Sequence, residues 1–237
     1  MLTISNHHSY AEQWIKETDL LEANGIYEKL AAAVPLGRVL EIGCGAGKGT
    51  SQLIQQHEVL SLDNNPHLID AARQNVCVAS NVTIHECNLF TLTENDKKII
   101  SSFQPNAIVG WFLGGCGEDI FSKTEGVTEL TEKAKLYREK LEDIIISEEI
   151  LIDTVNTINL VYRGKKVSHL SDQEVKDSQA KNYNTYVFDQ VGFKVTDVRL
   201  FDWPREGSDF TYGAAHNPNL VQGATNPIII SLIAQRT

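Results

Sequence analysis

The stretch that decides the fold is Arg38 to Asp63, RVLEIGCGAGKGTSQLIQQHEVLSLD. Val39–Ile42 is a short apolar run with β-branched members, which is typical of a buried parallel strand. Glycines follow at alternate positions, and a helix is predicted to start at Lys48. A strand, a glycine turn and a helix N-terminus together let backbone approach a ligand closely.

A second apolar run, Val59–Leu62, ends on an acid, Asp63. An acid at the tip of the second strand is well placed to accept hydrogen bonds from ribose hydroxyls. The two features together predict a site for a cofactor that contains a nucleoside.

The glycine spacing decides which cofactor is expected. A dinucleotide fingerprint needs G-x-G-x-x-G, but the sixth position is Lys48 counted from Gly43 and Thr50 counted from Gly45. A phosphate-binding P-loop also fails, because Ile42 and Gly49 occupy two of its required places. An NAD-dependent oxidoreductase is therefore disfavoured.

The pattern present is E-x-G-x-G-x-G, within VLEIGCGAG at positions 39–47. It resembles the first motif of the class I S-adenosylmethionine-dependent methyltransferases, and Asp63 resembles the ribose-binding acid of that family. The resemblance covers about residues 26–155 well. It implies methyl transfer from S-adenosylmethionine with release of S-adenosylhomocysteine. The cofactor-binding residues that it implies are Glu41, Gly43, Cys44, Gly45, Gly47, Asp63, Asn64, Asn88, Leu89, Gly110 and Trp111.

Two positions depart from the family pattern. Asn88 stands where the family usually has an Asp that binds the adenine amino group, and an amide oxygen can still accept that bond. Asn106 replaces the acid that usually precedes the fourth strand. These replacements keep open a non-catalytic module that only binds S-adenosylmethionine.

The resemblance implies a Rossmann-like α/β three-layer sandwich. Its seven-stranded sheet is mostly parallel with an antiparallel final strand, and helices lie on both faces. We expect the fifth strand at Glu149–Asp153 and an irregular or β segment over 156–169. The sixth strand is expected at Gly192–Leu200 and the closing strand at Pro227–Ala234.

A single domain over residues 1–237 is predicted, since no repeat or interdomain linker is visible. Residues 1–25 form an N-terminal arm or lid with a short helix over Tyr10–Leu21, and residues 26–155 form the cofactor-binding core. Residues 156–237 form the C-terminal sheet edge. The connection over 202–226 is much longer than hairpin loops of about 2–5 residues, which is typical of a functional lid.

The composition limits the kinds of partner and the location that we expect for this protein. A hydrophobic content of 42% and a charged content of 22% are those of a soluble globular protein. The net charge of −10 argues against a nucleic-acid partner. No apolar run suits a bilayer and no signal-peptide layout is visible, so we expect a cytoplasmic protein, either a monomer or a homodimer. The four cysteines show no zinc spacing, and no metal is expected.

The acceptor is predicted less well than the cofactor, because the sulfonium supplies the driving force and the protein mainly aligns the reactants. A small-molecule acceptor is favoured, with a protein or peptide acceptor as the alternative. The substrate-binding candidates are Tyr10, Trp111, Phe112, Trp203 and Tyr212. The candidates for a general base are His216, Asp202, Tyr183 and Glu118, and Asp119 next to Glu118 could also meet a substrate amine.

Overall fold

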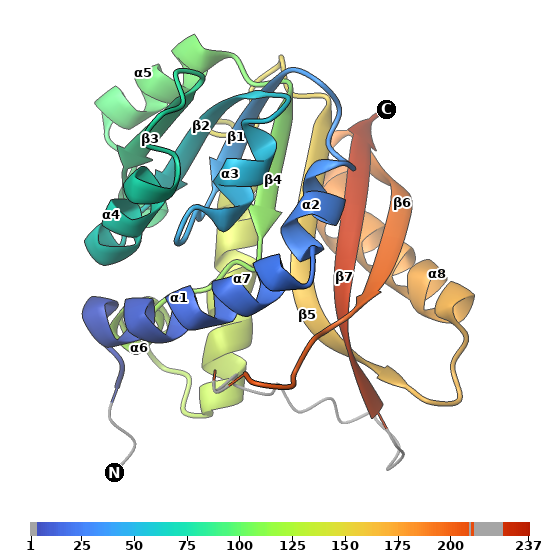
Figure 1. The fold of residues 1–237 in the computed structure, drawn as a ribbon. Coiled ribbons are helices and arrows are strands. Elements are labelled where there is room, and N and C mark those ends of the chain that lie inside the picture. The colour runs from blue at the N-terminus through green and yellow to red at the C-terminus, as the bar shows by residue number, and fades with distance from the viewer. Residues whose placement is uncertain (1–3, 209, 211–224) are drawn as a thin grey trace.

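The computed structural model describes residues 4–208, 210 and 225–237. Its centre is a seven-stranded sheet with the order β3-β2-β1-β4-β5-β7-β6 (Figure 1). The strands are β1 (Arg38–Ile42), β2 (Glu58–Asp63), β3 (Val82–Glu86), β4 (Ala107–Trp111), β5 (Thr157–Val167), β6 (Phe193–Asp202) and β7 (Thr225–Arg236). Strands β1 to β5 pair in parallel, and β7 runs antiparallel to both β5 and β6. The predicted fold class is confirmed.

Helices cover both faces of this sheet (Figure 1). One face packs against α5, α7 and α8, and the other against α1 to α4. The α-helices are α1 (His7–Ala23), α2 (Ile26–Ala31), α3 (Lys48–Leu53), α4 (Pro66–Asn75), α5 (Glu94–Phe103), α6 (Gly117–Lys123), α7 (Leu130–Ile145) and α8 (Asp172–Tyr183). Three short helical turns are η1 (Leu89–Thr91), η2 (Asn184–Phe188) and η3 (Asp189–Val191).

The sheet separates the hydrophobic core into two halves, one on each face. Successive side chains of a strand point to opposite faces, so each strand contributes to both halves. In β1, Leu40 and Ile42 are fully buried against the α5, α7 and α8 layer. Val39, also fully buried, packs with α1 to α4. The apolar run that predicted a buried strand is therefore covered on both faces.

The predicted fifth strand at Glu149–Asp153 is wrong. These residues form turns, in which Ile150 and Leu151 donate backbone hydrogen bonds to Ser147 O at 3.1 and 2.8 Å. Ile150 is fully buried, so the apolar run packs in the core without joining the sheet. The strand lies instead at Thr157–Val167, in the segment expected to be irregular or β.

Helix α1 is longer than the predicted Tyr10–Leu21 helix because Asn6 begins it. The Asn6 side chain accepts from Ser9 N and the Ser9 side chain interacts with the Asn6 backbone, which forms a capping box. Residues His7 and His8 therefore belong to an ordered helix. Figure 1 shows α1 crossing the carboxyl end of the sheet, beside α6 and α7.

Within the described residues, none of the helices has the length and apolar character needed to cross a membrane.

Candidate active site

A cavity of about 700 Å³ opens at the carboxyl ends of β1, β2 and β4. One wall consists of the glycine turn and the tips of β2 and β3. The rest of the lining comes from α1, the segment after β4 and α7. Open α/β sheets bind ligands at this edge.

The glycine turn between β1 and α3 has a backbone that suits glycine alone. Gly43, Gly45 and Gly47 all have positive φ, at 72°, 54° and 80°. A Cβ on Gly45 would lie 2.6 Å from the Trp14 indole nitrogen, and one on Gly47 would lie 2.7 Å from the Ala72 Cα. The alternate glycines thus bring α1 and α4 close to the turn, as well as leaving backbone open to a ligand.

Asp63, at the tip of β2, is held by the backbone. Its carboxylate accepts hydrogen bonds from Gly45 N at 2.8 Å and from Asn65 N at 2.9 Å. Burial raises the pKa of Asp63 from its ordinary value, and these backbone hydrogen bonds oppose that rise. A carboxylate has about four lone-pair sites, so it retains capacity for ribose hydroxyls.

Glu41 lies beneath the turn and away from the lining of the cavity. It is buried and accepts from the hydroxyls of Thr50 and Ser61, each at 2.6 Å. Burial raises the pKa of Glu41 to about 7, and the two hydroxyls oppose that rise. This first acid of the motif therefore ties β1 to β2 and α3.

The tip of β4 is strained. Phe112 has φ of +59°, in the left-handed region that non-glycine residues rarely adopt, and its N–H donates to Val161 O at 2.7 Å. Both Trp111 and Phe112 line the cavity. The Trp111 indole donates to the buried Asn159 Oδ1 at 2.7 Å, which ties its orientation to β5.

Helix α1 supplies Tyr10 and Trp14 to the lining of the cavity. Trp14 packs edge-on against Phe112 and Phe210, with ring centroids 6.3 and 5.4 Å apart. Burial raises the pKa of the Tyr10 phenol well above its ordinary value, so this hydroxyl is neutral at pH 7. The side of the cavity under α1 is therefore mostly aromatic.

The segment after β6 is fastened to α1. The Trp203 indole and the Ser208 hydroxyl both donate to the buried Glu17 carboxylate, at 3.3 and 2.6 Å. The Arg163 guanidinium lies 5.1 Å from the Trp14 ring centroid and 5.8 Å from that of Trp203. These contacts join α1, β5 and the start of the 202–226 connection.

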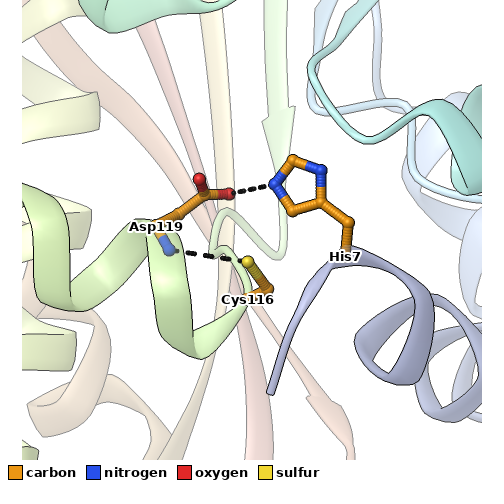
Figure 2. Close-up of side chains that lie close together, drawn as sticks. All are labelled: His7, Cys116 and Asp119. Atoms are coloured by element: carbon orange, nitrogen blue, oxygen red, sulfur yellow. Dashed lines mark hydrogen bonds and ion pairs between the residues drawn. The ribbon is translucent and has the colours of Figure 1, made fainter. Parts of the chain in front are cut away.

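A cluster of polar side chains joins α1 to α6 beside the cavity (Figure 2). His7 Nε2 lies 3.1 Å from Asp119 Oδ2, and Asn64 Nδ2 donates to the same oxygen at 3.2 Å. Cys116 Sγ accepts from Asp119 N at 3.5 Å. Burial raises the pKa of the Cys116 thiol to about 11.

Of the predicted site residues that the structure describes, nine line the cavity and eight do not. Those that line the cavity are Gly43, Gly45, Asp63, Asn64, Asn88, Leu89, Tyr10, Trp111 and Phe112. Those that do not line it are Glu41, Cys44, Gly47, Gly110, Glu118, Tyr183, Asp202 and Trp203. Tyr212 and His216 lie outside the described residues.

Two of the base candidates are held elsewhere in the fold. Tyr183, the last residue of α8, is buried, donates to Glu142 at 3.0 Å and stacks on Tyr162. Asp202 is exposed at the end of β6, opposite Ile228. Their sequence positions suggested proximity to the reaction, but neither lines the cavity.

Several lining residues were missed by sequence reasoning. Trp14, Cys116 and Tyr137 line the cavity, as does Asp119, which the sequence singled out only together with Glu118. His7 and Asp119 are 112 positions apart, so no short sequence motif predicts their contact. The helical position of Trp14, one turn after Tyr10, was the one available signal.

Comparison with known proteins agrees with this site. Residues 39–109 match the model of a family described as "Methyltransferase domain". The matched segment runs from β1 to β4 and contains the glycine turn, Asp63 and Asn88. A search of curated proteins finds no match.

Solved structures that match this chain do so at low sequence identity. A TehB-like SAM-dependent methyltransferase from Corynebacterium glutamicum is 17% identical, with 94% of this chain and 97% of that chain covered and a TM-score of 0.45. Magnesium protoporphyrin IX methyltransferase from Synechocystis, solved with bound SAM, is 13% identical, with 94% and 81% covered and a TM-score of 0.45. The 23S rRNA methyltransferase ErmE is 16% identical, with 89% and 67% covered and a TM-score of 0.46.

The family match contains the E-x-G-x-G-x-G turn at Glu41–Gly47 and the acid at Asp63, and both meet at one cavity. Residues 39–109 therefore match a methyltransferase domain, and S-adenosylmethionine is the cofactor that this match supports.

Proposed function

We propose that this enzyme transfers the methyl group of S-adenosylmethionine to a small molecule that binds under α1. The observation that carries this proposal is that one cavity has two kinds of lining. The glycine turn, Asp63 and Asn88 line it together with the aromatic residues Tyr10, Trp14 and Phe112.

The cofactor side is proposed to bind by backbone and carboxylate contacts. Asp63 would accept the ribose hydroxyls, since its carboxylate already faces the cavity from the tip of β2. Asn88 would accept from the adenine amino group, although its Oδ1 also accepts from Phe90 N at 3.0 Å. Gly43 and Gly45 would let backbone approach the methionine part. Trp111 also lines the cavity, and it is proposed to contact either the cofactor or the acceptor.

The aromatic side is proposed to bind the acceptor and exclude water. Methyl transfer from a sulfonium needs the nucleophile, the methyl carbon and the sulfur to be aligned. Trp14 and Phe112 are buried, and Tyr10 is partly buried, so a small apolar or aromatic acceptor matches this wall better than a protein surface. The net charge of −10 further disfavours a nucleic-acid acceptor.

The groups best placed to position an acceptor are Asp119, Tyr10 and Tyr137. All three line the cavity. Burial raises the pKa of both phenols well above the ordinary value, so they would act as neutral hydrogen-bond donors or acceptors. Asp119 is proposed in place of Glu118, which is exposed in the first turn of α6.

The proposal is tested by turnover. The purified chain is incubated with S-adenosylmethionine and a panel of small thiols, phenols, amines and carboxylic acids, and S-adenosylhomocysteine is quantified against a reaction without acceptor. A matched panel holds folded proteins and RNA. Product that depends on a small acceptor and falls at least about tenfold in Asp119→Asn supports the proposal. Product that depends only on protein or RNA contradicts it.

A further inference from the structure

We propose that His7, Cys116 and Asp119 form a binding site for a divalent cation of the zinc type at the wall of the cavity. Each side chain offers one ligand atom, and the three atoms all lie within 4.8 Å of one another. Figure 2 shows the imidazole of His7 reaching from α1 toward the Asp119 carboxylate, with the Cys116 thiol below them at the start of α6.

The donor set selects the cation. An imidazole nitrogen, a thiolate sulfur and a carboxylate oxygen are the three ligand types that Zn²⁺ takes in proteins. Mg²⁺ and Ca²⁺ prefer oxygen ligands alone, so a sulfur and a nitrogen disfavour them. A thiolate and a carboxylate carry two negative charges between them, which balance the charge of the cation.

The spacing of the ligands is close to what a single ion requires. His7 Nε2 and Asp119 Oδ2 lie 3.1 Å apart. Zinc bonds of about 2.0–2.3 Å in a tetrahedron give ligand–ligand distances slightly longer than this. Cys116 Sγ lies within 4.8 Å of both atoms, so binding a single ion would draw the three ligand atoms around it.

Neighbouring residues hold two of the ligands in place. Asn64 Nδ2 donates to Asp119 Oδ2 at 3.2 Å, and Asn65 Nδ2 donates to the His7 backbone oxygen at 2.9 Å. Such outer contacts orient metal ligands and raise affinity. Both asparagines come directly after Asp63, so the cation site is built onto the same β2 tip as the proposed ribose site.

Three protein ligands leave one position of a tetrahedral ion open, as in catalytic zinc sites. Cys116 and Asp119 line the cavity, so the open position would face its interior. A thiol, hydroxyl or water in the cavity could occupy it. The cation would also tie α1 to α6 across the cavity. Cation binding does not depend on the proposed methyl transfer, and each can fail without the other.

The test is a titration of the full chain, first freed of metal with a chelator, with Zn²⁺ and in parallel with Mg²⁺. One equivalent of Zn²⁺ should bind, and Mg²⁺ should not compete. Affinity for Zn²⁺ should fall at least about tenfold in each of His7→Gln, Cys116→Ser and Asp119→Asn. Ser at position 116 can still cap α6, and Asn at position 119 can still accept from Asn64, so both variants preserve the local hydrogen bonds.

Two matched controls separate this site from adventitious binding. His8→Gln removes the neighbouring histidine on α1, and Cys77→Ser removes an exposed free thiol. Both should leave the affinity for Zn²⁺ unchanged. Cobalt substitution of the unaltered chain should give a thiolate-to-metal charge-transfer band, a readout that needs no variant to fold. Absence of zinc binding, absence of that band, unchanged affinity in Cys116→Ser and Asp119→Asn, or loss of binding in Cys77→Ser would each overturn the proposal.

Discussion

The Asp63 carboxylate accepts a hydrogen bond from the backbone N–H of Gly45 at 2.8 Å. This contact joins the tip of β2 to the glycine turn after β1, so the two halves of the proposed cofactor site are one hydrogen-bonded unit. A change at Asp63 therefore affects the shape of the turn as well as the charge of the site.

We expect Asp63→Asn to weaken S-adenosylhomocysteine binding by at least about tenfold. Hydrogen bonds to a charged group contribute about 1.5–3 kcal/mol, and about 1.4 kcal/mol is a factor of ten in affinity. The asparagine keeps an oxygen that can accept from Gly45 N. Asp63→Ala would leave that N–H without its acceptor. A loss of affinity in that variant could then come from a distorted turn and not from the missing carboxylate.

Calorimetric titration measures this effect, and Asp202→Asn is the matched control. Asp202 is an exposed acid at the end of β6, away from the cavity lining. If Asp63→Asn and Asp202→Asn bind equally well, Asp63 does not contact the cofactor.

Glu41 should make stability depend on pH. Its pKa is raised by burial from 4.5 to about 7 in the folded chain, so the folded state holds a proton that the unfolded state releases between these values. Stability from this group is full below pH 4.5 and is lost as pH rises through about 7. The loss should approach about 3 kcal/mol at about 1.4 kcal/mol per pH unit.

The measurement is urea unfolding of the unaltered chain and of Glu41→Gln at several pH values from 4.5 to 8. Glutamine does not titrate and can still accept from Thr50 and Ser61, so its stability should become relatively greater as pH rises. Glu58→Gln, at an exposed acid on β2, is the control and should follow the unaltered chain. A constant difference between Glu41→Gln and the unaltered chain would show that Glu41 is ionised throughout.

Trp14→Ala should both destabilise the chain and weaken ligand binding. Removing a buried tryptophan costs about 3–5 kcal/mol, and this indole packs over Gly45, Phe112 and Phe210. Thermal unfolding and S-adenosylhomocysteine titration below the melting temperature measure the two effects. Gln13→Ala, at an exposed position of the same helix, should change neither. If Trp14→Ala binds S-adenosylhomocysteine as tightly as the unaltered chain, α1 does not cover the bound ligand.

Asn159→Ala should reduce stability by at least about 2 kcal/mol. The amide accepts from Trp111 Nε1 at 2.7 Å and donates to Ser231 Oγ and Leu232 O at 2.8 and 2.9 Å. Its removal leaves buried polar groups unpaired at about 1–3 kcal/mol each. Denaturant unfolding measures the loss, with the exposed Lys165→Ala on β5 as control. A loss no greater than that of Lys165→Ala would mean that Trp111 finds another acceptor.

The sequence predicted the glycine turn, the second strand and Asp63 at its tip because these signals are local. Alternate glycines, a short apolar strand and an acid at the next strand tip lie within Arg38–Asp63, and backbone geometry connects them directly. The fifth strand was misplaced because Glu149–Asp153 is as apolar as a strand should be. Burial alone does not distinguish a buried turn from a strand, as the fully buried Ile150 shows.

The contacts of α1 with α6 and with the segment after β6 were not predicted because they are long-range. His7 meets Asp119 and Trp203 meets Glu17 across 112 and 186 positions, which no spacing rule covers. The same limit misplaced Tyr183 among the base candidates. The division into an arm, a core and a sheet edge with a lid over 202–226 stays a prediction, as does the monomeric or homodimeric state.

The most direct test of the account is calorimetric titration of the purified chain with S-adenosylmethionine, S-adenosylhomocysteine and NAD in parallel. We expect the first two to bind at one equivalent, to bind at least about tenfold more weakly in Asp63→Asn, and NAD to give no signal. Failure of both sulfur nucleosides to bind a folded chain, or binding of NAD in their place, would contradict the account.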